Sequence, residues 1–207
     1  MQKEGSLDVE DIQRQLQKAF NTLKKCFNGI KEVEEKARPC IKMIINLTEQ
    51  FHCCTAVTSP GLPLNIDFNE VRQKLLYKIS TEINENISKL QTLICRYEEY
   101  SDCMGSQYDR SMSKCGRYTA AKDISQLLER SPLYPSVTDM LEWVQISERS
   151  IRETYLCKKF IIDTFSPDQP GICDSLESSW QEGDKDLYNQ LDEYIALTSN
   201  FMEMKIS

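Results

Sequence analysis

The sequence predicts an all-α protein of five to seven helices, and three observations support this prediction. Apolar residues recur every three or four positions over long stretches, which is the spacing of one helix face. Glycine and proline are scarce, with seven of each in 207 residues, and they gather at a few joints. Almost no segment alternates apolar and polar residues over five or more positions, so strands are not expected.

The first predicted helix runs from about Asp8 to Phe27 and should stop at Asn28–Gly29, because glycine is favoured just past a helix end. Its apolar residues share one face: Ile12, Leu16, Ala19, Phe20, Leu23 and Phe27. The pattern resumes over Ile30–Phe51 with Pro39 inside it. Because proline lacks the amide donor, we expect Pro39 to kink this segment or to begin a new helix.

The longest predicted helix follows a loop expected over Thr55–Ile66, and no glycine or proline interrupts it from Leu64 to Met104. Its apolar stripe consists of Phe68, Val71, Leu75, Ile79, Ile83, Ile87, Leu90, Ile94 and Tyr97. At ~1.5 Å per residue such a helix reaches roughly 45–55 Å, which is more than a compact domain of this size requires. We therefore expect part of residues 68–104 to pair with another chain or to project as a coiled-coil arm.

A polar segment, Gly105–Arg117, is bounded by glycines and is expected to be mobile. A short helix is predicted over Thr119–Arg130. The two prolines of Ser131–Pro135 should end it, because the residue before a proline avoids the helical region.

The stretch PSVTDMLEWV opens a further helix with a capping box. The hydroxyl of Ser136 can accept a hydrogen bond from the amide of Asp139, whose carboxylate can accept one from the amide of Ser136. This helix should run to about Thr164. Its inward residues would be Met140, Leu141, Val144, Ile151, Tyr155 and Ile162.

A final helix is predicted over about Asp184–Met204, with its apolar residues on one face: Leu187, Leu191, Tyr194, Ile195 and Met202. The segment 163–207 holds ten acidic residues and two lysines, and this acidic tail would suit a basic partner. There is no repeat of fixed period and no clear linker, so residues 1–207 are interpreted as a single helical domain.

Composition excludes several classes of function. The net charge is −7 and no basic face dominates, so direct sequence-specific binding of nucleic acid is not expected. Neither a signal peptide nor a membrane-spanning apolar run is visible, so we expect a soluble intracellular protein without a membrane partner. The nine cysteines form no CxxC motif and are interpreted as free thiols in small apolar sites.

The sequence indicates no catalytic, metal or cofactor site. His52 is followed by Cys53 and Cys54, but consecutive helical residues point about 100° apart and cannot converge on one ion, so an ordinary helix end is favoured. No glycine-rich phosphate loop occurs. The charged pairs are interpreted as solvated helix surface: Glu34–Glu35, Glu98–Glu99, Asp192–Glu193, Lys24–Lys25 and Lys158–Lys159.

Trp143 is the residue that most suggests an interface. It lies at the flank of its helix's apolar stripe, so it is either a core residue or an exposed anchor of the kind enriched in binding hot spots. The candidate partner interface combines residues of the capped helix with residues of the long helix: Met140, Leu141, Trp143, Val144 and Tyr155, with Ile83, Ile87, Leu90 and Ile94.

The stretch Pro135–Ile162, PSVTDMLEWVQISERSIRETYLCKKFII, resembles the AIRIM family of helical ribosome-maturation factors. Leu23–Phe27 resembles the same family, and Pro39–Gln50 agrees more loosely. The sequence departs from the family at Asn28–Gly29, where the family has a proline. It departs again at Cys157, where a lysine is expected and a positive charge is lost.

The resemblance implies a non-catalytic adaptor subunit that pairs with a second small helical protein, CINP, and docks on a pair of AAA+ ATPases. Those ATPases supply the energy to strip a placeholder protein from late precursors of the large ribosomal subunit. The resemblance also implies a role in protein turnover at replication forks, and location in the cytoplasm and nucleus. A cysteine-dependent enzyme and a generic coiled-coil tether are the alternatives.

Overall fold

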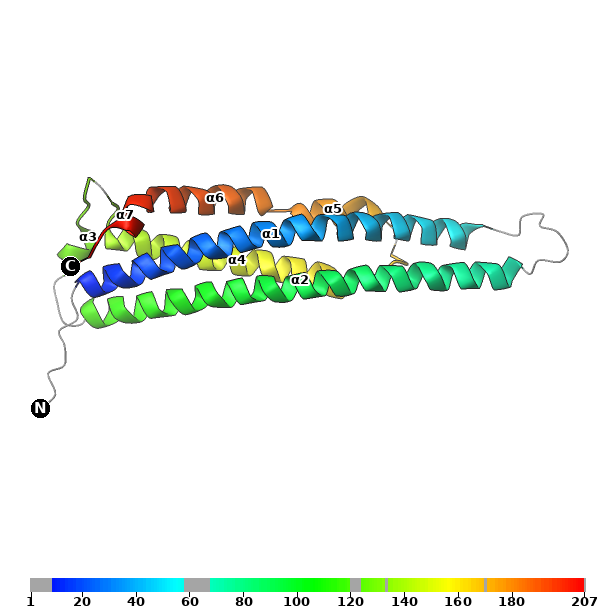
Figure 1. Ribbon diagram of the computed structural model, residues 1–207, viewed down its shortest axis with the longest axis horizontal. Coiled ribbons are helices and arrows are strands. Elements are labelled where there is room, and N and C mark those ends of the chain that lie inside the picture. Colours follow the sequence, from blue (N-terminus) through cyan, green and yellow to red (C-terminus); the bar gives the residue numbers. More distant parts are fainter. Residues whose placement is uncertain (1–8, 58–67, 120–123, 133, 170, 207) are drawn as a thin grey trace, which may run out of the picture. The chain divides into compact units, whose positions relative to one another are not determined.

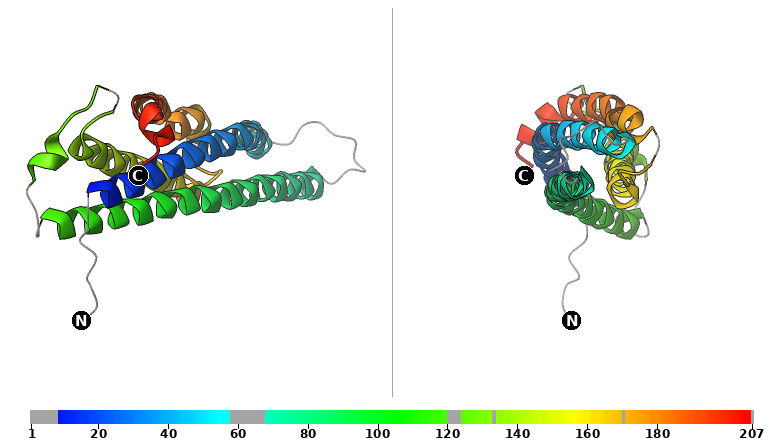
Figure 2. Two further views of the ribbon diagram at one scale, coloured as in Figure 1. Left: turned by 60° about the vertical axis from the view of Figure 1, so that its left-hand side comes forward. Right: turned by 90° about the vertical axis from the view of Figure 1, so that its right-hand side faces the viewer.

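The computed structural model describes residues 9–57, 68–119, 124–132, 134–169 and 171–206, which form seven helices (Figure 1). Three are long: α1 (Val9–Ala56), α2 (Phe68–Thr119) and α4 (Val137–Thr164). Four are short: α3 (Ser125–Leu128), α5 (Ile172–Gln181), α6 (Asp184–Leu197) and α7 (Ser199–Glu203). Two further views of the described residues also contain helices and no strand (Figure 2), so the all-α prediction is confirmed.

Helix α1 is continuous over 48 residues, so the predicted stop at Asn28–Gly29 and a new helix at Pro39 are both wrong. Gly29 is buried, and the side chain of Tyr100 on α2 lies over it. A Cβ atom at this position would lie 2.3 Å from Cζ of Tyr100. Pro39 and Glu35 are both exposed, so water can satisfy the Glu35 carbonyl oxygen that proline leaves without its helical donor.

Helix α2 continues past Met104 to Thr119, so the prediction of a mobile segment over Gly105–Arg117 is wrong. Two residues beyond the predicted end, Ser111 and Tyr118, are buried. Lys114 Nζ donates to the carbonyl oxygen of Asp11 on α1 at 3.1 Å. These contacts hold the end of α2 despite its polar sequence.

The predictions for the connecting segments are met in part. The loop expected over Thr55–Ile66 begins after Ala56, and residues 58–67 lie outside the described part of the chain. Of the short helix expected over Thr119–Arg130, only α3 forms among the described residues, since 120–123 are outside them.

The chain divides into two compact units, and each long helix contributes to both. We call the described residues of Met1–Lys31, Tyr97–Tyr155 and Gly183–Ser207 the terminal unit, and those of Glu32–Arg96 and Leu156–Glu182 the central unit. The predictions of a single domain over residues 1–207 and of a projecting arm over residues 68–104 stay predictions.

The terminal unit is built from the first part of α1, the second part of α2, the first part of α4, and α6. Its fully buried side chains include Leu16, Phe20, Leu23, Ile30, Tyr97, Met104, Met140, Val144, Ile151 and Leu191. Phe27 of α1 meets Tyr188 of α6 edge to face, with ring centroids 5.8 Å apart. The side-chain amide of Gln17 donates to the carbonyl oxygens of Phe201 and Met204, which fixes α7 on α1.

The central unit is built from the second part of α1, the first part of α2, the end of α4, and α5. Leu47, Ile79 and Ile83 form a buried cluster, against which Phe51, Cys54, Ile87 and Phe165 pack. The predicted stripe of the long helix is therefore covered by this chain from Ile79 onward. Leu75 and Val71, one and two turns before Ile79, are exposed.

The last predicted helix, Asp184–Met204, is two helices, α6 and α7, which meet at Thr198. Thr198 is buried and its hydroxyl donates to the carbonyl oxygen of Tyr194 at 2.7 Å. The sequence interpretation missed α5, whose buried residues are Leu176 and Trp180. Gly183 separates α5 from α6 with a φ of 79°, a left-handed conformation that favours glycine.

Candidate partner-binding groove

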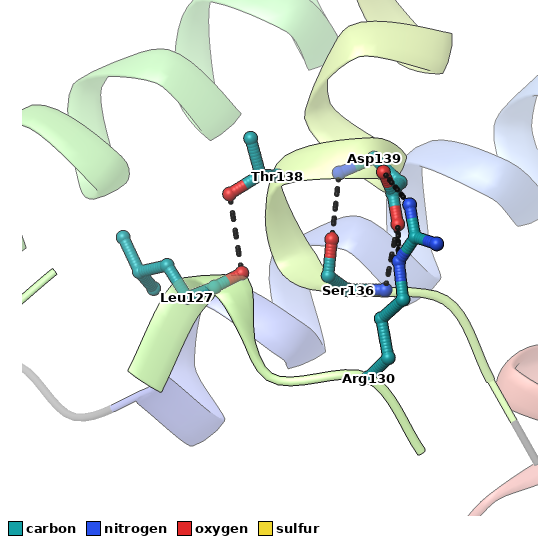
Figure 3. A network of polar contacts seen from close by, with 5 residues as sticks. All are labelled: Leu127, Arg130, Ser136, Thr138 and Asp139. Carbon is teal, nitrogen blue, oxygen red and sulfur yellow. Dashed lines mark hydrogen bonds and ion pairs between the residues drawn. The ribbon is translucent and has the colours of Figure 1, made fainter. Parts of the chain in front are cut away.

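The start of α4 is fixed by the predicted capping box, which the structure confirms (Figure 3). The amide of Asp139 donates to Oγ of Ser136 at 3.1 Å, and the amide of Ser136 donates to Oδ2 of Asp139 at 3.2 Å. Arg130 adds a contact that sequence reasoning missed. Its Nε and Nη2 donate to the two carboxylate oxygens of Asp139 at 3.1 and 3.0 Å.

These contacts hold Asp139 in its charged form. The hydrogen bond with the Ser136 side chain lowers the pKa of Asp139 most, and the hydrogen bond and charge of Arg130 lower it further. A second tie joins α3 to α4, since Thr138 Oγ1 donates to the carbonyl oxygen of Leu127 at 3.1 Å (Figure 3). The segment between α3 and α4 is thus anchored at both ends within the terminal unit.

Trp143 stacks on Tyr194 of α6, with ring centroids 5.3 Å apart and ring planes 8° apart. Trp143 is half-buried, so the structure places it between the two alternatives of core residue and exposed anchor. Burial raises the pKa of Tyr194, with smaller contributions from Glu193 and Glu142. The phenol therefore stays uncharged at neutral pH and presents a flat apolar face to the indole.

An open groove of about 560 Å³ lies beside this aromatic pair. We call it the α4 groove, and it is lined by Arg130, Ser131, Pro132, Tyr134, Pro135, Asp139, Trp143 and Leu197. Leu197, at the end of α6, is 49% exposed. Aromatic and aliphatic walls with an Arg–Asp pair at the rim are typical of a site for a protein segment, because apolar anchors supply affinity and the rim supplies orientation.

The other predicted interface residues lie mostly in the chain's own core. Met140, Val144, Tyr155, Ile83, Leu90 and Ile94 are buried, while Leu141 and Ile87 are half-buried. The structure brings only Trp143 of this set to the α4 groove. The assignment of the set to a partner interface stays a prediction. Arg130, Tyr134, Tyr194 and Leu197 were missed, because nothing in their local sequence indicates that they converge.

A buried polar network in the central unit was also missed. Lys158 Nζ lies 3.2 Å from Oε1 of Glu34 and donates to the carbonyl oxygen of Trp180 at 2.5 Å. The indole Nε1 of Trp180 donates to Oε2 of Glu34 at 2.8 Å. The interpretation of Glu34 and Lys158 as solvated surface is therefore wrong. The signal was present: Lys158 falls in register with buried Tyr155 and Ile162.

His52 makes one contact that bears on the enzyme alternative. Its Nε2 lies 2.6 Å from the carbonyl oxygen of Pro167 in the central unit. Because a carbonyl oxygen only accepts, Nε2 carries the proton in this contact, and in the neutral ring Nδ1 is the nitrogen that could act as a base. Among the described residues, no group of three or more His, Cys, Asp or Glu could hold a metal ion. All nine cysteines are free thiols, but Cys53, Cys95, Cys103 and Cys157 are exposed, so the prediction that they fill small apolar sites is wrong for these four.

No helix in the described ranges combines the length and apolar character needed to cross a bilayer.

Comparison with known proteins gives a consistent match over most of the chain. The model of the C1orf109-like family of ribosome biogenesis proteins matches residues 10–199. The AFG2-interacting ribosome maturation factor of Xenopus tropicalis is 28% identical over 176 residues, 82% of each chain. The human protein of the same name is 25% identical over 186 residues, 86% of this chain and 92% of its own. The Danio rerio protein is 25% identical over 170 residues, 82% of this chain and 84% of its own.

Proposed function

Since the chain belongs to the C1orf109-like family of ribosome biogenesis proteins, we propose that it is a maturation factor that binds an AFG2-type AAA+ ATPase. The observation that carries the proposal is the family match over residues 10–199, which includes every residue lining the α4 groove. The relatives' name, AFG2-interacting ribosome maturation factor, supplies the partner class.

The proposed role is that of a non-catalytic adaptor in maturation of the large ribosomal subunit. The chain pairs with a CINP-like helical protein, and the ATPase supplies the energy to release a placeholder maturation factor from the pre-ribosomal particle. The protein would act in the cytoplasm and nucleus, with a further role in protein turnover at replication forks. The two-unit helical build supports a docking role, because long helices place separate surfaces on one chain.

We assign the ATPase to the α4 groove. An apolar side chain of the ATPase would lie against Trp143 and Leu197, and the rim formed by Arg130 and Asp139 would orient the segment that carries it. Capping and stacking hold the groove in shape before binding, which reduces the ordering cost of association.

The test is a binding measurement between the purified full chain and an AFG2-type ATPase. Leu197→Glu places a charge in the groove without disturbing a buried residue, and it should weaken binding at least tenfold. The matched control is Leu156→Glu, because Leu156 is 53% exposed, lies in the central unit and lines no part of the groove. The affinity of the Leu156→Glu variant for the ATPase should stay within twofold of the wild-type value.

Two outcomes contradict the proposal at different levels. If the wild-type chain does not bind the ATPase, the proposed partner is wrong. If Leu197→Glu and Leu156→Glu weaken ATPase binding equally, the partner is supported but the α4 groove is not its binding site. Circular dichroism of each variant checks that the helices are retained.

Trp143→Ala measures how much of the binding energy the aromatic wall supplies. As an anchor, Trp143 should contribute about 2 kcal/mol or more to binding. As a core residue, its removal should cost about 3–5 kcal/mol of stability. Because Trp143 is half-buried and stacks on Tyr194, Trp143→Ala should lower both the affinity for the ATPase and the stability of the fold. Its binding result is therefore compared with that of Leu197→Glu, in which the fold is expected to be intact.

A further inference from the structure

Two cysteines from different helices meet in the terminal unit. Cys26 of α1 directs its Sγ at the carbonyl oxygen of Tyr100 on α2, 3.8 Å away. Cys103 follows Tyr100 by three residues and therefore lies on the same face of α2, one turn on. Besides burial, the Cys103 side chain raises the pKa of Cys26, so the two thiols are neighbours. Cys26 thus has a single neighbouring thiol that reaches it from another helix.

The ring of Tyr100 on α2 lies against α1 close to Cys26. Gly29 lies one turn beyond Cys26, and a Cβ atom on it would meet the Tyr100 ring at 2.3 Å. Only a residue without a side chain leaves room for the ring in this position. A disulfide requires Cα atoms about 4.4–6.8 Å apart. The 3.8 Å contact of Cys26 Sγ with the Tyr100 carbonyl oxygen brings this thiol to the backbone of α2, one turn from Cys103.

The two thiols differ in access. Cys103 is exposed, whereas Cys26 is 3% exposed. Burial and the neighbouring Cys103 raise the pKa of Cys26 to about 12, so Cys26 is a protonated, shielded thiol at neutral pH. A small oxidant in solvent therefore reaches Cys103 first and finds Cys26 directly behind it.

We propose that Cys26 and Cys103 are a reversible redox pair that closes to a disulfide between α1 and α2. With a peroxide as oxidant, the Cys103 sulfur attacks one peroxide oxygen, the O–O bond breaks, and a sulfenic acid and one water form. The Cys26 sulfur then attacks the sulfenic sulfur. The S–S bond forms, the S–O bond breaks, and the Cys26 proton leaves with the hydroxide as a second water.

In this reaction each sulfur loses one electron and the peroxide gains two. A dithiol reductant reverses the reaction by thiol–disulfide exchange. Such transient disulfides are the kind found in reducing compartments, where permanent ones are rare. Closure ties α1 to α2 across a long loop of the chain, which restricts the unfolded state and should raise the melting temperature of the oxidised protein.

The test uses the full chain treated with hydrogen peroxide and then digested without reductant. The expected product is a cross-linked peptide pair containing Cys26 and Cys103, with the intact protein lighter by two hydrogen atoms and a higher Tm. Both changes should disappear on addition of a dithiol reductant. Cys103→Ser alters an exposed residue and should abolish the cross-link and the Tm shift, and Cys26→Ser should abolish the cross-link.

Cys95→Ser is the matched control, because Cys95 is also an exposed cysteine of α2, and this variant should keep the cross-link. The proposal is overturned if wild-type Cys103 accumulates as sulfenic or sulfinic acid while Cys26 stays a free thiol. It is also overturned if either cysteine pairs with a different one of the nine.

Discussion

Lys158 and Glu34 form an ion pair inside the central unit, with Nζ and Oε1 3.2 Å apart and side chains only 2% and 6% exposed. Lys158 also lies over the ring of Trp180, 4.7 Å from its centroid. One network therefore joins α1, α4 and α5. Two charges removed from water are tolerated here because each is paired and hydrogen-bonded.

Removing one member of this pair should destabilise the protein strongly. Lys158→Met leaves the Glu34 carboxylate buried without its cation, which costs about 3–5 kcal/mol. Lys159→Met, the exposed neighbour, should change stability by less than about 1 kcal/mol. The measurement is the free energy of unfolding in urea. Similar values for the two variants would contradict the burial of Lys158.

The double variant Lys158→Met with Glu34→Leu tests whether the charges stabilise each other. It should cost clearly less than the sum of the two single changes, because no unpaired charge remains. Strict additivity would mean that the pair does not interact.

Gly29 should resist even a methyl group. Gly29→Ala gains helix propensity of about 1 kcal/mol, but the contact with the Tyr100 ring opposes it by about 1–3 kcal/mol, so net destabilisation is expected. Gly116→Ala in α2 is the matched control. A Cβ there meets nothing within 4 Å, so this variant should be more stable than wild type. Thermal melts compare the two.

A second substitution separates the effect of helix propensity at Gly29 from that of the contact with the Tyr100 ring. In a Tyr100→Ala background the ring is absent, and Gly29→Ala should become stabilising. If the substitution is equally harmful in both backgrounds, the Tyr100 ring is not the reason for the glycine.

The capping box at the start of α4 should carry measurable stability. Ser136→Ala removes the acceptor for the Asp139 amide and is expected to cost about 0.5–2 kcal/mol. Ser113→Ala, at an exposed interior position of α2, should be neutral or slightly stabilising, because alanine is the better helix former. Chemical denaturation of both variants checks the difference.

The same cap predicts a pH dependence through Asp139. Its pKa is lowered from 3.8 by folding, so its ionised form stabilises the native state above that pH. This contribution is lost as the pH falls below 3.8 through the folded value. Asp139→Asn should therefore be less stable than wild type at pH 7. The difference in free energy of unfolding between the two proteins should become smaller below pH 3.8.

The sequence by itself determined the features that depend on neighbours along the chain. Helical spacing set the all-α class, and Ser136 and Asp139 set the start of α4, because a capping box is completed within one turn. The resemblance to the AIRIM family, drawn from residues 135–162, is confirmed by the family match over residues 10–199.

Where helices stop was decided by tertiary contacts. Gly29, Pro39 and Gly105 each carry a local cost of about 1 to 3 kcal/mol in a helix interior. Burying each large side chain of the long apolar stripes returns about 1.5–3 kcal/mol, so the helices continue through all three positions. A local sequence pattern does not reveal this burial energy, because the residues that cover the apolar stripes are distant in sequence.

The sites were likewise decided by the fold. Lys158 is buried because Glu34 and Trp180, 124 and 22 positions away in sequence, supply its counter-charge and its acceptor. The α4 groove exists because α6 carries Leu197 to the start of α4, where Tyr194 stacks on the groove residue Trp143. Charge and aromaticity are properties of a residue, but whether a charge is solvated or an aromatic ring covered is a property of the surroundings that only packing provides.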